Sequence, residues 1–195
     1  MFQAVDQGLE DVVAFILEDK SVNVNERNNY GWTPLAIAVM RSNEGIVKML
    51  LRREDIDVNA PDHMGGTALL AAAEEGDDQI VKLLLQQKRL NLNGSIVLPA
   101  ELNSIRNPLL VAAMKGHEKV VKALVAREGI DVNASGKHCN TPLMYAAKGG
   151  HFGIVKDLLD HPDIDIHVRN FHGLTALDML TKLEKLGPTY ILKVP

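Results

Sequence analysis

Two adjacent residues of this chain, His138 and Cys139, are of types that can act together in nucleophilic catalysis. A thiol attacks only when a base activates it and a third group orients that base. Neighbouring residues at a loop tip tend to point apart, and the sequence places no orienting group beside this pair. We therefore expect an ordinary loop pair, no catalytic residue, and a chain that is not an enzyme.

Histidine is the second residue type that could take part in chemistry, as a metal ligand. His117 and His151 occupy equivalent positions in successive repeats of one sequence phrase. Packed helices have axes about 8–10 Å apart, whereas zinc needs nitrogens at about 2.0–2.1 Å, so one ion shared between stacked helices is disfavoured. Gly65-Gly66 and Gly149-Gly150 lack the Lys and the Ser or Thr that follow the glycines of a phosphate-binding loop. The sequence predicts no metal site and no cofactor.

Charge and composition narrow the classes of partner. The formal net charge is −4 and aromatic residues make up 4% of the chain. The lysines that recur at one position, Lys48, Lys82, Lys122 and Lys156, are best interpreted as a solvated row, with a weak electrostatic contact as the alternative. We expect no nucleic-acid binding.

The same composition bears on the compartment. The sequence has no run of about 18 apolar residues, so we expect neither a membrane span nor a signal peptide. The single cysteine fits a reducing compartment. We expect a cytoplasmic protein, and the nucleus or delivery into a host cytosol stays open.

The elements that must position any functional side chain repeat along the chain. A phrase of the type T-P-L-x-x-A returns at a constant interval, which is lengthened once, and it begins at Thr33, Thr67, Asn107, Thr141 and Thr175. Thr or Asn before Pro is a good helix start, and the glycine that follows about eight residues later is a common helix stop. A period of this size predicts a stack of short supersecondary units.

A second phrase follows each of the first four, as in IVKMLLRREDIDVN, which ends at Asn59. Its apolar residues Ile46, Val47, Met49, Leu50 and Leu51 form a stripe too wide for a helix packed on one side only. Each unit is therefore predicted to be a helix, a tight turn, a second helix with neighbours on two sides, and a polar loop.

With these phrases in place, the chain resembles the ankyrin repeat family over nearly its whole length. The resemblance implies an all-α solenoid of stacked helix-turn-helix units with projecting β-hairpin fingers. It also implies that His117 and His151, each after an inter-helix glycine, help to fix the turn. Two departures stand out. The repeat is one residue longer than is usual in the family, and the family's His after T-P-L is replaced by Ala36, Leu70, Leu110, Met144 and Asp178.

The resemblance implies one domain over residues 1–195. We expect an N-terminal capping half repeat (1–27), repeats at 28–61, 62–101 (with a lengthened finger), 102–135 and 136–169, and a C-terminal capping half repeat (170–195). Because both edges look capped, we expect a monomer.

In function, the resemblance implies a non-catalytic protein–protein interaction module, an adaptor or scaffold that binds another protein across the fingers and the first helices. The alternative is a targeting or substrate-presenting segment of a larger signalling protein, immune receptor or microbial effector. The predicted contact residues are Tyr30, Trp32, Met40, Arg41, His63, Met64, Glu74, Glu75, Ile96, Val97, Leu98, Arg106, Met114, Lys115, Lys137, His138, Asn140, Phe171 and His172.

Several of these residues leave alternatives open. Trp32 either contacts a partner with Tyr30 or stiffens the neighbouring finger. The acidic turn at 74–78, between Arg41 and Lys115 of adjacent repeats, either selects a charged partner or is simply solvated. Ile96, Val97 and Leu98, in the lengthened finger, either contact a partner or pack on the protein itself. Asn59 resembles an asparagine hydroxylation site, although we expect it to hold its own loop.

Overall fold

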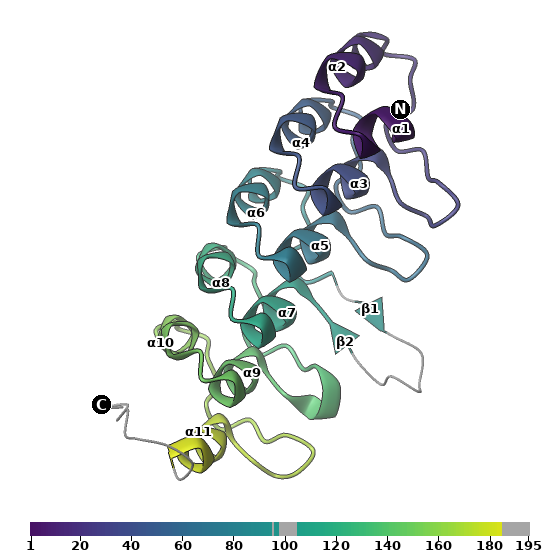
Figure 1. The fold of residues 1–195 in the computed structure, drawn as a ribbon. Coiled ribbons are helices and arrows are strands. Elements are labelled where there is room, and N and C mark those ends of the chain that lie inside the picture. Colours follow the sequence, from purple (N-terminus) through teal and green to yellow (C-terminus); the bar gives the residue numbers. More distant parts are fainter. Residues whose placement is uncertain (95, 98–104, 185–195) are drawn as a thin grey trace.

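The computed structural model describes residues 1–94, 96–97 and 105–184. Its helices form two rows that step along one axis (Figure 1). The first row holds α1 (Phe2–Asp6), α3 (Pro34–Met40), α5 (Ala68–Glu75), α7 (Pro108–Lys115), α9 (Pro142–Gly149) and α11 (Ala176–Glu184). The second row holds α2 (Glu10–Glu18), α4 (Glu44–Leu51), α6 (Asp78–Leu85), α8 (Glu118–Val125) and α10 (Phe152–Leu159). The expected all-α solenoid of stacked helix pairs is confirmed.

Four first-row helices begin where the sequence predicts, because a polar side chain closes the first turn. The Thr33 hydroxyl accepts a hydrogen bond from the backbone N–H of Ala36 at 3.2 Å, and the Asn107 side chain accepts one from Leu110 at 2.8 Å. The caps of α5 and α9 have the same arrangement. In α3, α7 and α9 a proline follows the cap, where its missing N–H costs nothing.

The turn between the helices of a unit depends on glycine and on a histidine from the next unit. Gly76 and Gly116 end α5 and α7 at φ of 78° and 80°, a left-handed conformation that favours glycine. A Cβ atom on Gly76 would lie 2.5 Å from Nδ1 of His117, and one on Gly116 would lie 2.6 Å from Cε1 of His151. The two histidines therefore pack against the turn of the preceding unit.

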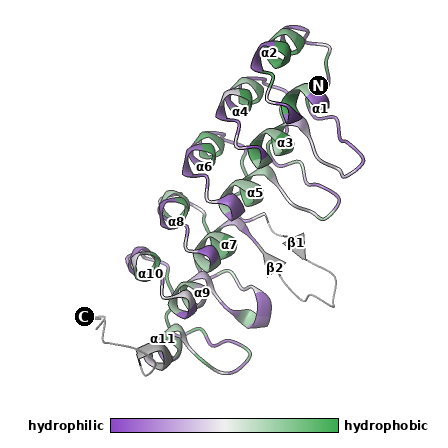
Figure 2. Ribbon diagram, in the orientation of Figure 1, coloured by the Kyte–Doolittle hydropathy of each residue, from purple (hydrophilic) through white to green (hydrophobic). Residues whose placement is uncertain are grey.

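The core lies between the two rows and between successive units. In α4, Ile46, Val47 and Leu50 are fully buried, while Met49 and Leu51 are partly buried. This helix contacts α2 on one side and α6 on the other, as its wide apolar stripe predicts. Figure 2 shows the second-row helices hydrophobic on one side and hydrophilic on the other. Each unit thus completes its core only with its neighbours.

In the first four units, an asparagine at the end of the loop bridges to the next unit. The Asn59 side chain donates to the carbonyl oxygen of Arg89 and accepts from the backbone N–H of Asn91, both at 2.7 Å. The expectation that Asn59 holds its own loop is wrong, because Asp57 does so by accepting from the backbone N–H of Asn59 at 3.0 Å. The same two bonds to the following unit recur along the stack, and we call these residues the asparagine row: Asn25, Asn59, Asn93 and Asn133.

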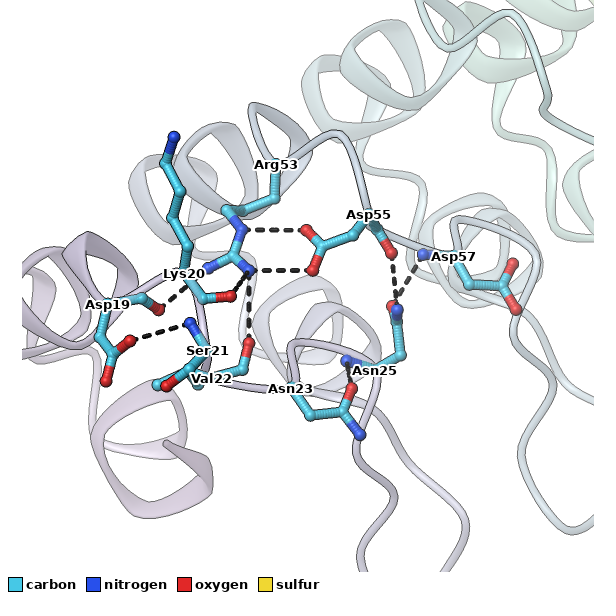
Figure 3. Close-up of polar contacts among 9 residues, drawn as sticks. All are labelled: Asp19, Lys20, Ser21, Val22, Asn23, Asn25, Arg53, Asp55 and Asp57. Carbon is cyan, nitrogen blue, oxygen red and sulfur yellow. Dashed lines mark hydrogen bonds and ion pairs between the residues drawn. The ribbon is translucent and has the colours of Figure 1, made fainter.

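Arg53 makes a further link between the first two units (Figure 3). Its guanidinium bonds both carboxylate oxygens of Asp55 at 2.9 Å and donates to the carbonyl oxygens of Lys20 and Val22 at 3.2 and 3.3 Å. The hydrogen bond from Arg53 also lowers the pKa of the Asp55 carboxyl. The loop after α2 is therefore held to the end of α4 by a charged side chain that is only 14% exposed.

A finger projects before each first-row helix from α3 onward (Figure 1). Three fingers are folded by an Asn or Asp at the base: Asn28, Asp62 and Asn170 each accept two backbone N–H bonds from within the finger, at 2.8–3.0 Å. The lengthened finger instead pairs β1 (Ile96–Val97) with β2 (Ile105–Arg106), antiparallel. Among the described residues, the β-ladder expected of the fingers is present in this one alone.

The N-terminal edge differs from the expected cap. Capping repeats need a polar outer face, yet α2 leaves Val12 44% and Phe15 74% exposed, and Leu9 just before the helix is 44% exposed. These exposed apolar residues are unlike the polar outer face of a capping repeat, and the expected N-terminal capping half repeat (1–27) stays a prediction. The expected monomer, which rested on capped edges, stays a prediction.

Candidate functional site

The aromatic pair predicted at one finger tip is prearranged. The ring centroids of Tyr30 and Trp32 lie 4.8 Å apart, with their planes inclined by 30°. Both residues donate a backbone N–H to the side chain of Asn28, which fixes the finger beneath them. Tyr30 is 65% exposed, whereas Trp32 is half-buried against the core. The pair offers aromatic surface whose ordering cost has been met by folding.

Two hollows open on the first-row side of the N-terminal units. The first has a volume of about 510 Å³ and lies among α1, α3 and the Tyr30 finger. The second has a volume of about 280 Å³ and lies among α3, α5 and the next finger. Trp32 and Met40 line both hollows. We call the joined pair the Trp32–Met40 groove.

The groove brings together a large share of the predicted contact residues. Tyr30 and Arg41 line the first hollow, and Met64, Glu74 and Glu75 line the second, with Trp32 and Met40 between them. His63 is exposed on the same finger as Met64, and its backbone N–H donates to the carbonyl oxygen of Tyr30 at 3.3 Å. Two adjacent fingers are thereby joined at the edge of the groove.

The charges in the groove are divided between its two hollows. In the first hollow, Nε and Nη2 of Arg41 lie 2.9 and 2.8 Å from one carboxylate oxygen of Asp6, so the two charges offset each other. The second hollow is lined by Asp62, Glu74 and Glu75. Nζ of Lys115 lies 3.4 Å from the Glu74 carboxylate. The alternation of charge noted in the sequence is therefore present, but Arg41 pairs within its own hollow.

The C-terminal fingers carry a second, separate group of predicted residues. Phe171 is 78% exposed, and its ring packs edge-on against His172 with centroids 5.7 Å apart. The His172 ring lies 6.0 Å from that of His138, and the backbone N–H of Phe171 donates to the carbonyl oxygen of His138 at 2.8 Å. On the same finger as His138, Lys137 is exposed, and two exposed residues, Met114 and Lys115, lie at the end of α7. The fingers project on one side of the stack (Figure 1), but this second group does not line the groove.

Asn140 does not belong to this surface. It is buried, and its side-chain oxygen accepts from Nδ2 of Asn170 at 2.9 Å, which ties two fingers together from inside. Tyr145 lies beside it, and burial raises the pKa of the Tyr145 hydroxyl, which donates to the carbonyl oxygen of Lys137 at 3.2 Å. For Ile96, Val97 and Arg106 the structure describes the backbone strand pairing, and Leu98 lies outside the described residues.

The potentially reactive side chains named in the sequence analysis do not come together in a reactive site. His138 and Cys139 both lie at φ of 59° in the short 3₁₀ turn Lys137–Cys139, and Cys139 is exposed. Nε2 of His117 lies 3.1 Å from the carbonyl oxygen of Glu74. Across the described residues, no three His, Cys, Asp or Glu side chains come close enough to hold a metal ion. Over the same ranges, every helix is too short or too polar to cross a membrane.

Sequence reasoning missed the part of the groove that α1 provides. Phe2, Gln3 and Asp6 line the first hollow. Asp6 holds the place in the first unit that Met40 holds in the second, so the repeat period could have identified it. The same period aligns Phe2 and Gln3 with Ala36 and Ile37, which also line the groove.

Comparison with known proteins agrees with this architecture. A family model described as ankyrin repeats (3 copies) matches residues 1–96 and 91–170. The fold is similar to the crystal structure of EF0377, an ankyrin repeat protein, with a TM-score of 0.82 and 27% sequence identity over 94% of this chain and 91% of that one. A search of curated proteins found no match. Since the family model covers most of the sequence, this chain belongs to the ankyrin repeat family.

Proposed function

We propose that this chain is a non-catalytic adaptor or scaffold module that binds another protein across its fingers and first-row helices. Ankyrin repeats generally serve in protein–protein interaction, and the Trp32–Met40 groove supports such a role for this chain. Met40, Met64 and Tyr30 are 37%, 61% and 65% exposed around two hollows that share Trp32 and Met40 as lining residues. Exposed apolar side chains gathered around a hollow mark an interaction site more often than single exposed ones do.

The rigidity of this surface supports the proposal. Tyr30 and Trp32 are held by the Asn28 side chain, and Met64 is held in the same way by Asp62, whose carboxylate accepts its backbone N–H at 2.8 Å. Binding to a preformed surface loses less conformational entropy than binding to a mobile loop. Aromatic and Arg side chains also dominate binding energy when they lie at the centre of an interface.

Two matched variants, each with an alanine replaced by phenylalanine, test the proposal. Ala71 lines the second hollow, so Ala71→Phe should fill it. Ala126 is exposed at the end of α8, in the second row, so Ala126→Phe adds the same ring away from the groove. Proteins retained from a lysate by the native chain and by Ala126→Phe should be lost with Ala71→Phe, provided that circular dichroism shows all three folded. Retention of the same proteins by Ala71→Phe would contradict binding at the groove.

A further inference from the structure

We propose that the second hollow of the Trp32–Met40 groove receives a Lys or Arg side chain of the partner, adjacent to a bulky apolar side chain that enters the first hollow. This inference rests on the proposed function and adds the chemistry of the segment that is bound. The partner class is therefore a protein segment that is both cationic and apolar.

The two hollows share an apolar lining. Met40 is 37% exposed, Met64 is 61% exposed and Trp32 is half-buried, while Leu70 beneath them is 4% exposed. Methionine side chains adapt their shape to an apolar partner. In the first hollow, Phe2 and Tyr30 extend the same apolar lining. A bulky aliphatic or aromatic side chain fits that hollow, whose one ion pair, between Arg41 and Asp6, is already complete.

The second hollow has an acidic lining. Its charged lining residues are Asp62, Glu74 and Glu75, and none of its lining residues is cationic. Asp62 accepts two backbone N–H bonds with one oxygen, which holds this carboxylate in place among the lining residues of the hollow. Glu74 shares its charge with Lys115. Glu75 is exposed and makes no ion pair with any described residue.

Position and size favour a long cationic side chain over a free cation or a small ligand. The hollow holds about 280 Å³ and is open to solvent, which suits one side chain. Lys and Arg bury an aliphatic stem along apolar surface while the charged end stays near water. Here the stem would lie on Met40 and Met64, and the charge would reach Glu75 at the rim. Trp32 also lines this hollow, and a cation beside its ring would be attracted to it.

The test is a selection of short random displayed peptides on the immobilised full chain. Enriched sequences should pair a Lys or Arg with a nearby bulky apolar residue. Synthetic copies should bind about tenfold or more weakly to Glu75→Lys, because a like charge then faces the peptide cation. The matched control is Glu128→Lys, which reverses an exposed charge after α8, in the second row, and should change the affinity by less than about twofold.

The outcomes separate this inference from the proposed function. Enriched peptides that are acidic or uncharged, yet are lost on Ala71→Phe, would overturn the cationic partner and leave the groove as the binding site. Peptides that bind Ala71→Phe and Glu75→Lys as well as the native chain would place binding elsewhere and overturn the inference. A selection that enriches nothing would also overturn it, while the lysate experiment would still judge the proposed function.

Discussion

Replacing Asn59 by alanine tests whether the asparagine row holds the repeats together. The side chain supplies one donor and one acceptor to the next unit, each at 2.7 Å, and no other side chain replaces either bond to Arg89 or Asn91 among the described residues. Asn59→Ala should therefore lower the free energy of unfolding while leaving its own loop folded, since Asp57 holds that loop independently.

The magnitude follows from two neutral hydrogen bonds at a half-buried site. Each is worth about 0.5–1.5 kcal/mol net, because both loops exchange the lost bond for water. The variant should lose about 1–3 kcal/mol, which corresponds to a fall in Tm of about 2–4 °C per kcal/mol for a chain of this size. Asn59→Asp should lose at least as much, since a carboxylate keeps the acceptor but faces the carbonyl oxygen of Arg89 with a negative charge.

Urea unfolding followed by circular dichroism measures the change. His167 is the matched control, because it holds the same place in the last loop, where the structure shows no bond from its side chain to a further described unit. His167→Ala should change stability by less than about 0.5 kcal/mol. If Asn59→Ala cost no more than this control, the row would be a geometric coincidence of stacking and the reasoning would be refuted.

Four further outcomes follow from the structure. Arg53→Met should cost about 1–3 kcal/mol of unfolding free energy by removing charged hydrogen bonds to three carbonyl oxygens of the preceding unit. Arg52→Met, at the exposed neighbouring position, should cost little in the same urea assay. Gly116→Ala should destabilise the chain by more than about 1 kcal/mol, because φ is 80° and the new Cβ would meet the next unit's histidine; an unchanged Tm would show that the turn can relax. Hydrogen bonds from Arg53 and Lys82 lower the pKa of the carboxyls of Asp55 and Asp78. Their contribution to the free energy of unfolding is therefore present above pH of about 4 and is lost as the pH falls through the lowered pKa values. A urea midpoint that stays constant down to pH of about 3 would contradict this. Sedimentation should show a monomer at micromolar concentration, and a dimer that is lost on Phe15→Glu would instead assign an interface to the uncovered face of α2.

The fold could be predicted from the sequence because its decisive signals are local and recur. Thr33 and Asn107 each start a helix by bonding an N–H three residues ahead, and the repetition of that signal identifies a stack before any tertiary contact is known. The stripe in α4 predicted a helix with two flanking neighbours for the same reason. Local geometry was enough for these features.

Three features that sequence reasoning missed depend on contacts between units. Asn59 was assigned to its own loop, although its partners lie 30 and 32 residues ahead and come within reach only after the units stack. Arg53 has one equivalent, Arg127, whereas the matching positions of the other units hold Asp19, Gln87 and His161, so the period gives no consistent signal for its bonds to the loop after α2. The outer surface of α2 could not be judged without knowing which of its sides α4 covers.

The candidate site was predicted in its residue types but not in its shape. Tyr30, Trp32, Met40 and Met64 were chosen from their repeat positions, and they do line one groove. Asn140 occupies a comparable position but turns inward to Asn170, a choice that the repeat alignment does not contain. The pairing of Arg41 with Asp6 likewise depends on side-chain placement across two units.

The position of Asn93 in the asparagine row bears on the spacing of the fingers that a partner would contact. The extra residues of the lengthened finger follow Asn93, yet its bonds to the carbonyl oxygen of Gly129 and the N–H of Asp131, at 2.7 and 2.9 Å, match those of the other members of the row. The pitch of the stack is thus independent of finger length. The spacing between two finger tips along the axis is set by the number of repeats between them and not by the number of residues. A finger can therefore be lengthened without moving the contact points on either side of it.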